Sequence, residues 1–123
     1  MDILTPNVVS RHLTRTAGQP LPSNPEPGDL IAFNTALAKL LLRLKRDTGA
    51  TTVAQNYRGT GSRAYRRQVF VRFPNKVTDL WLENDRIELG GVTTVLGKLP
   101  YGDKSPEQVY AELVPVLKAW ATA

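Results

Sequence analysis

The sequence contains no cysteine and a single histidine, His12. Disulfide bonds and thiolate metal sites are therefore excluded, and the usual catalytic triads and dyads lack their parts. A lone histidine in a segment with helical spacing is more often a packing residue than a catalytic base. We therefore expect a protein that is not an enzyme and that uses no metal and no other cofactor.

Long apolar runs are also missing. The longest, from Leu37 to Leu44, is interrupted by Lys39 and Arg43, whereas a membrane-spanning helix needs about 20 mostly apolar residues. The first residues, Met1 to Pro6, lack the basic and apolar regions of a secretory signal. We expect a cytoplasmic protein without a membrane segment.

What the chain does contain suits one folded domain. It has 123 residues, of which 41% are hydrophobic and 22% charged, as is ordinary for a globular protein with one core. Residues 1–28 are expected to form a short helix, at about 6–16, followed by a connector rich in proline. Residues 29–123 are expected to form the core of a single α+β domain.

Two longer segments have the spacing of amphipathic helices. The first runs from Asp29, a plausible N-cap, to Thr48, with Gly49 after its end. The second begins at Ser105 with the capping-box pattern Ser-Pro-Glu-Gln and continues to about Ala121. Pro115 lies inside this second helix and is expected to kink or interrupt it.

Between the helices the pattern is that of β-strands. Segments 51–57, 66–73, 77–83 and 86–89 are read as strands, and 92–96 as a possible fifth. Two-residue turns at Asn75-Lys76 and Asn84-Asp85 would pair Val71 with Leu80, Val69 with Leu82, and Leu82 with Ile87, on one apolar face. We therefore predict an antiparallel meander of three to five strands, with the two main helices packed on that face.

The same register predicts the opposite face of the sheet. It places Phe70 opposite Trp81, Arg72 opposite Asp79, and Glu83 opposite Arg86, all favourable cross-strand pairs. The carboxylates of this region then balance surface charge and do not form a catalytic or metal-binding cluster. If the first helix or the connector covers this face, Phe70 and Trp81 form a second small core; if nothing covers it, they mark a binding surface.

Acidic residues are absent from one long interval of the chain. The net charge is +5, yet residues 1–76 carry 12 Lys and Arg against 4 Asp and Glu. No Asp or Glu lies between Asp47 and Asp79, where six basic residues fall. Such a segment attracts polyanions within a Debye length of about 10 Å at moderate salt.

Aromatic residues interleave with the arginines of this interval. Arginine contacts phosphates and aromatic rings stack on bases, a combination typical of proteins that bind single strands with little sequence selectivity. The glycine-containing segment 58–63 lacks the lysine of a nucleotide-binding phosphate loop. We predict a non-catalytic nucleic-acid-binding protein, monomeric or homodimeric. Its expected site residues are Arg58, Arg63, Tyr65, Arg66, Arg67 and Arg72, helped by Tyr57 and by a basic ridge of Lys39, Arg43 and Arg46.

Two other interpretations stay open. The arginines can be a solvated surface that keeps an edge strand from aggregating, with no ligand at all. Alternatively, the protein is a binding or inhibitory module, of the type found as accessory proteins of phages and mobile elements, that docks on another protein through the face of Phe70 and Trp81 or through the charged helix. The sequence does not separate DNA from RNA.

Overall fold

A computed structural model describes residues 19–56, 67–90 and 95–123 of the chain. Within these ranges five strands form one antiparallel sheet in the order β1-β2-β3-β4-β5, so each strand pairs with its sequence neighbour. The strands are β1 (Thr52–Asn56), β2 (Arg67–Arg72), β3 (Val77–Glu83), β4 (Arg86–Gly90) and β5 (Val95–Pro100). The predicted α+β class and antiparallel meander are confirmed, whereas the helix predicted at 6–16 lies outside the described residues.

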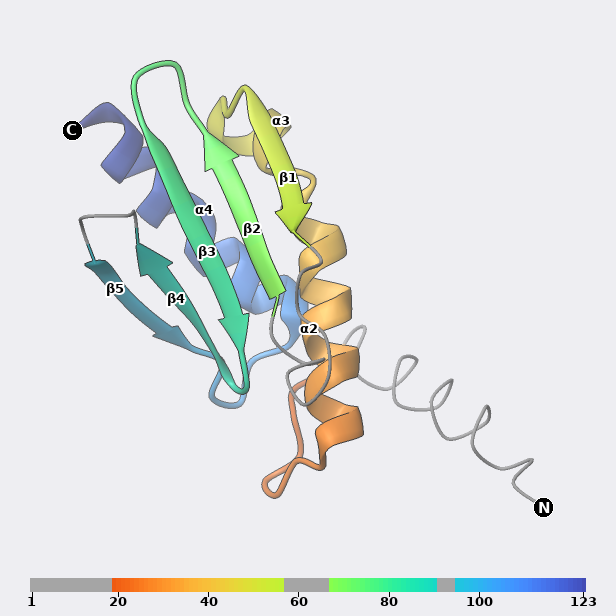
Figure 1. Cartoon of the computed structure of the whole chain (residues 1–123). Helices are drawn as coiled ribbons and strands as arrows, with labels where there is room; N and C mark the ends of the chain where they lie inside the picture. Colours follow the sequence, from red (N-terminus) through yellow and green to blue (C-terminus); the bar gives the residue numbers. More distant parts are fainter. Residues whose placement is uncertain (1–18, 57–66, 91–94) are drawn as a thin grey trace.

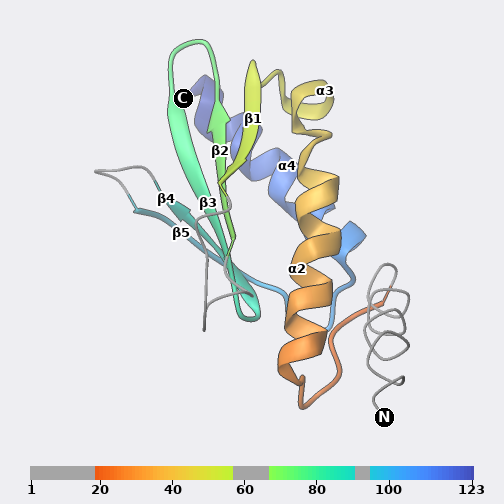
Figure 2. The ribbon, with the colours of Figure 1, turned by 45° about the vertical axis from the view of Figure 1, so that its right-hand side comes forward.

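The helices lie together on one side of the sheet. They are α2 (Pro27–Leu41), α3 (Leu44–Thr48) and α4 (Pro106–Thr122). In Figure 1 the sheet lies in front of α4, and the turned view of Figure 2 shows α2, α3 and α4 on the same side of it. The other face of the sheet is turned away from all three helices.

The first main helix begins earlier than the sequence suggested. Its N-cap is Glu26, whose backbone N–H donates to the Asp29 carboxylate at 3.0 Å, with Pro27 at the first helical position. Asp29 is therefore the third helical residue of a capping box, and its assignment as the N-cap was wrong. A carboxylate suits both positions because each lies at the positive end of the helix dipole.

The same helix was predicted to continue to Thr48, but it breaks after Leu41. The N–H groups of Leu42 and Arg43 donate three residues back, to Lys39 at 3.3 Å and Leu40 at 2.9 Å, which tightens the chain before α3 begins. No glycine or proline marks this break. Gly49 ends α3 as predicted, with φ of 80°, a left-handed conformation that glycine adopts without strain.

The turn at Asn84-Asp85 pairs Leu82 with Ile87 and Glu83 with Arg86, as predicted. The turn between β2 and β3 is different. The Phe73 N–H donates to the Lys76 carbonyl at 2.7 Å, so the central turn residues are Pro74-Asn75 and not Asn75-Lys76. Proline fixes the φ angle that the first central position of a turn requires.

This earlier turn shifts the β2–β3 register by two residues. Val69 pairs with Leu80 and Val71 with Thr78, so the two predicted pairs Val71–Leu80 and Val69–Leu82 were wrong. Side chains alternate with a period of two, and a shift of two keeps every residue on its predicted face. The apolar face was therefore identified correctly despite the wrong partners.

The C-terminal part departs from expectation at two places. The last strand is Val95–Pro100, later than the predicted 92–96, and a register irregularity lies at Leu89/Gly90. Helix α4 has the predicted capping box at Ser105 but runs unbroken through Pro115. Pro115 and Ala111 are both exposed, so water can hydrogen-bond the Ala111 carbonyl that proline leaves without a donor.

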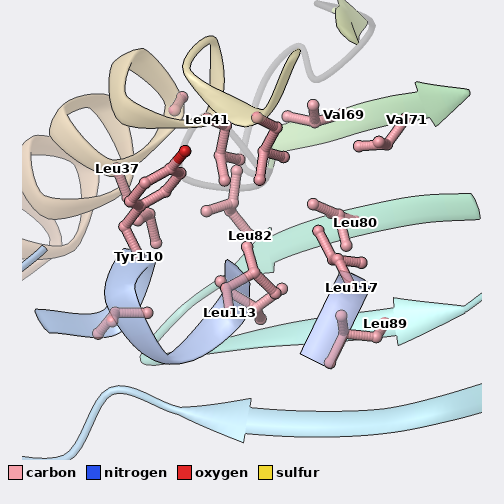
Figure 3. Close-up of a cluster of buried hydrophobic side chains, with 14 of the residues drawn as sticks. Leu37, Leu41, Val69, Val71, Leu80, Leu82, Leu89, Tyr110, Leu113 and Leu117 are labelled. Atoms are coloured by element: carbon pink, nitrogen blue, oxygen red, sulfur yellow. The ribbon is translucent and has the colours of Figure 1, made fainter. Parts of the chain in front are cut away.

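The core lies between the sheet and the helices. Figure 3 shows leucines of α2 and α4 pointing toward the valines and leucines of β2, β3 and β4. Many of these side chains are fully buried: Phe33, Leu37, Leu41, Leu44, Val69, Val71, Leu80, Leu82, Ile87, Leu113 and Leu117. Burying a side chain of this size stabilises the fold by about 1.5–3 kcal/mol, and together these side chains hold the helices against β2, β3 and β4.

A buried polar link joins α2 to the other end of the sheet. Tyr101 is fully buried, stacks on Phe33 with ring centroids 4.5 Å apart, and donates its hydroxyl hydrogen bond to Asn34 Oδ1. Asn34, itself fully buried, donates through Nδ2 to the Asn84 carbonyl at 3.2 Å. Asn84 has φ of 54°, in the left-handed region that asparagine tolerates.

Candidate nucleic-acid interface

The acid-free interval forms one border of the domain. It contains β1, which is an edge strand, and β2, which pairs with it from Thr52 opposite Arg72 to Asn56 opposite Gln68. Ten residues, 57–66, join the end of β1 to the start of β2. Most of the predicted site belongs to this connection: Tyr57, Arg58, Arg63, Tyr65 and Arg66 lie outside the described residues.

The two described arginines of the interval lie on opposite faces of the sheet. Arg67 shares the face of Val69 and Val71, and its Nη2 donates to Thr35 Oγ1 of α2 at 3.0 Å. Arg72 is exposed on the other face. The structure therefore does not bring Arg67 and Arg72 into one basic surface.

The basic ridge is partly neutralised. Arg43 lies 3.6 Å from the Glu107 carboxylate at the start of α4. Arg46 donates from Nε to Asp47 Oδ1 at 2.9 Å, and Tyr110 donates to Asp47 Oδ2 at 2.6 Å. The hydrogen bond from Arg46, and after it the one from Tyr110, lowers the pKa of Asp47. The hydrogen bond to Asp47 raises the pKa of Arg46.

Lys39 is the ridge residue best placed to act with the connection. It is exposed and no described acidic side chain forms an ion pair with it. It lies one helical turn from Thr35, the residue that Arg67 contacts. Arg67 is the first residue after the 57–66 connection, and its contact with Thr35 brings it to the helix that carries Lys39.

The aromatic pair on the outer face is partly exposed. Phe70 is 37% exposed, Val77 beside it is 48% exposed, and Trp81 is half-buried. The predicted pairs were wrong here as well, since Phe70 faces Asp79 and Trp81 faces Gln68. Leu21 of the connector packs against the helix-side core and not on this face.

Charges of both signs surround these aromatic residues. Glu88 contacts Arg86 at 3.1 Å and Lys98 at 3.9 Å, while Asp79 accepts a hydrogen bond from Gln68 at 3.1 Å. By strand alternation the described outward positions carry three cations and three anions, namely Arg72, Arg86, Lys98, Asp79, Glu83 and Glu88. This face therefore has no net charge with which to attract a polyanion.

Among the described residues no group of His, Cys, Asp and Glu side chains could hold a metal ion. No helix in that part of the chain is long and apolar enough to cross a membrane. The residues that sequence reasoning missed are Thr35 and Glu107, which contact Arg67 and Arg43, and Tyr110, which donates to Asp47. They are distant in sequence, and no local pattern signals their contacts.

Comparison with known protein families, with curated proteins and with solved structures finds no match to this chain.

Proposed function

We propose that the protein binds nucleic acid without catalysis, through the 57–66 connection with Arg67 and Lys39 at its base. The observation that carries this proposal is where the excess charge falls. The described residues carry 11 Lys and Arg against 10 Asp and Glu, whereas the whole chain has a net charge of +5. Nearly all the excess belongs to residues 1–18 and 57–66, and the second of these holds three arginines and no acid.

The mechanism is phosphate neutralisation with release of condensed counterions. Its affinity falls with salt, with a log–log slope of about −0.9 per duplex phosphate contacted or −0.7 per single-strand phosphate. Tyr57 and Tyr65 supply stacking to a single strand. Arg43 and Arg46 contribute little, because Glu107 and Asp47 already compensate their charges.

The test is a salt series of fluorescence-anisotropy titrations with duplex and single-stranded oligonucleotides. The first variant changes Arg58, Arg63 and Arg66 to Gln. The matched control changes Lys98, Lys104 and Lys118 to Gln, which alters the net charge equally but on β5, in the segment between β5 and α4, and on α4.

The arginine variant is expected to lose affinity, with a slope shallower by about one for each lost phosphate contact. The lysine variant should retain both affinity and slope. Equal losses of affinity in the two variants would show that only the net charge of the protein matters, and would refute the assignment of the site to the 57–66 connection. Undetectable binding by the wild type at low salt would also refute it.

A second function is favoured by a different observation, the apolar area on the charge-balanced outer face. Phe70 is exposed there between Val77, which is also exposed, and the half-buried Trp81, which suits docking on a protein. Trp81→Ala would then abolish association with that protein, while the arginine variant would leave it unchanged.

A further inference from the structure

The two edges of the sheet differ in how they are protected. Exposed edge strands can pair with other chains, and proteins commonly block them with lysine, proline or a bulge. The β5 edge contains Lys98 and Pro100, and Gly97 lies opposite Leu89, next to the irregularity at Leu89/Gly90. The β1 edge, Thr-Val-Ala-Gln-Asn, has no charge, proline or bulge.

The direction of the backbone groups follows from the hydrogen bonds. The Phe73 N–H points to β3, so by alternation the even-numbered residues of β2 point to β1. Thr52 and Ala54 pair with such residues, which leaves the N–H and C=O groups of Val53 and Gln55 on the open edge. The same alternation puts the backbone groups of Pro100 on the opposite edge, where its missing N–H costs nothing.

The open edge is held in an extended shape before any partner arrives. Gln55 donates from Nε2 to the Ala38 carbonyl of α2 at 3.1 Å, and Val53 packs against the core. Among the described residues, no backbone group outside β2 hydrogen-bonds to β1. A strand fixed in this way adds a partner strand without a large ordering cost.

Charge selects the partner. The edge strand and its neighbour lie entirely within the acid-free interval, with Arg72 opposite Thr52 and the arginine-containing connection directly after Asn56. Pairing β1 with β1 of a second copy would bring two such cationic segments together. An extended acidic segment instead meets cations beyond both ends of the strand, Arg72 opposite Thr52 at one end and the arginine-containing sequence that follows Asn56 at the other.

We propose that the β1 edge binds an extended acidic peptide segment of another protein by strand addition, with Val53 and Gln55 supplying the backbone hydrogen bonds. This interaction does not depend on nucleic-acid binding. Its hydrogen bonds use backbone groups of the edge, and the arginines add only attraction for acidic side chains, whereas the proposed nucleic-acid contacts use the side chains of the connection directly. The outer aromatic face takes no part in it.

The test uses a fluorescein-labelled peptide of alternating Glu and Val as the probe. Control probes are the Lys/Val peptide and the Glu/Val peptide N-methylated at every second residue, which cannot pair along one edge. The wild type should bind the Glu/Val peptide, and bind both control probes at least about tenfold more weakly. Equal binding of all three probes would overturn the proposal.

The site of binding is read from amide hydrogen exchange of the wild type. The Val53 and Gln55 amides should exchange fast in the free protein and slow down on addition of the Glu/Val peptide, while the Lys98 amide is unchanged. Val53→Pro, which removes an outward N–H but no bond to β2, should weaken binding about tenfold and leave oligonucleotide affinity unaltered. Protection of these amides in the free protein with a concentration-dependent dimer, or protection by an oligonucleotide instead of the peptide, would overturn it.

Discussion

The buried link between Asn34 and Tyr101 offers a sharp test of the fold. In Asn34→Leu the Tyr101 hydroxyl, which is fully buried, loses its acceptor, and the part-buried Asn84 carbonyl loses its donor. An orphaned buried polar group costs about 1–3 kcal/mol. We expect Asn34→Leu to lower the free energy of unfolding by about 2–3 kcal/mol, most of it from the tyrosine.

The matched variant is Tyr101→Phe, which keeps the stacking on Phe33 and removes the hydroxyl that donates to Asn34 Oδ1. It should cost about 1–2 kcal/mol. The double variant replaces both partners by apolar groups, so no hydroxyl is left unpaired and the two losses should not add. The expected coupling is about 1–2 kcal/mol.

The measurement is urea unfolding followed by far-ultraviolet circular dichroism for the wild type and the three variants. A loss in the double variant equal to the sum of the single losses, within about 0.5 kcal/mol, would show that the two groups do not interact. That result would refute the packing of α2 against the segment between β5 and α4.

Other predictions concern single elements. Leu41→Ala, at a fully buried position, should cost about 2–5 kcal/mol in urea unfolding, whereas Leu42→Ala, where the leucine is 57% exposed, should cost under about 0.5 kcal/mol; similar losses would contradict the burial of Leu41 and the exposure of Leu42. Lys76 donates to the Trp120 and Ala123 carbonyls at 2.7 and 2.8 Å, so Lys76→Met should cost about 1 kcal/mol and speed amide exchange in the last turn of α4. The pKa values of Tyr101 and Tyr110 are raised, and burial is the largest cause in each case. Both hydroxyl groups should therefore keep their protons at a pH near 10, where the tyrosines of the unfolded chain ionise. Stability is then intact below about pH 10 and falls as pH rises above it; an ultraviolet titration in which all the tyrosines of the folded protein ionise near pH 10 would contradict this.

The sequence was enough to predict which face of the sheet each side chain occupies, but not which residues pair across neighbouring strands. Alternation alone assigns Val69, Val71, Leu80 and Leu82 to the core, because any register that buries apolar residues uses the same face. The turn at Pro74-Asn75 and a turn one residue later both satisfy that condition, so only the hydrogen bond from Phe73 to Lys76 separates them. At the Asn84-Asp85 turn, the flanking Leu82 and Ile87 are consistent with one register between β3 and β4, and the structure has that register.

The helix break and the charge partners could not be read from the sequence. Leu42 and Arg43 are ordinary helix residues, so nothing in their sequence marks the tightened turn that precedes the fully buried Leu44. The ridge of Lys39, Arg43 and Arg46 was a valid helical pattern, yet Glu107 comes from a helix more than sixty residues away. A helical pattern shows which residues share a face but not what packs beside it.

Because the charge is distributed unevenly along the chain, salt should affect oligonucleotide binding and folding stability differently. Since the described part of the chain is nearly neutral, with 11 basic against 10 acidic residues, moderate salt should change its stability little. Ion pairs such as Arg43 with Glu107 are exposed and contribute at most about 1 kcal/mol. Phosphate contacts of the 57–66 connection, in contrast, weaken steeply with salt. A salt concentration that abolishes oligonucleotide binding and leaves the urea midpoint in place therefore reports on the arginines and not on the fold.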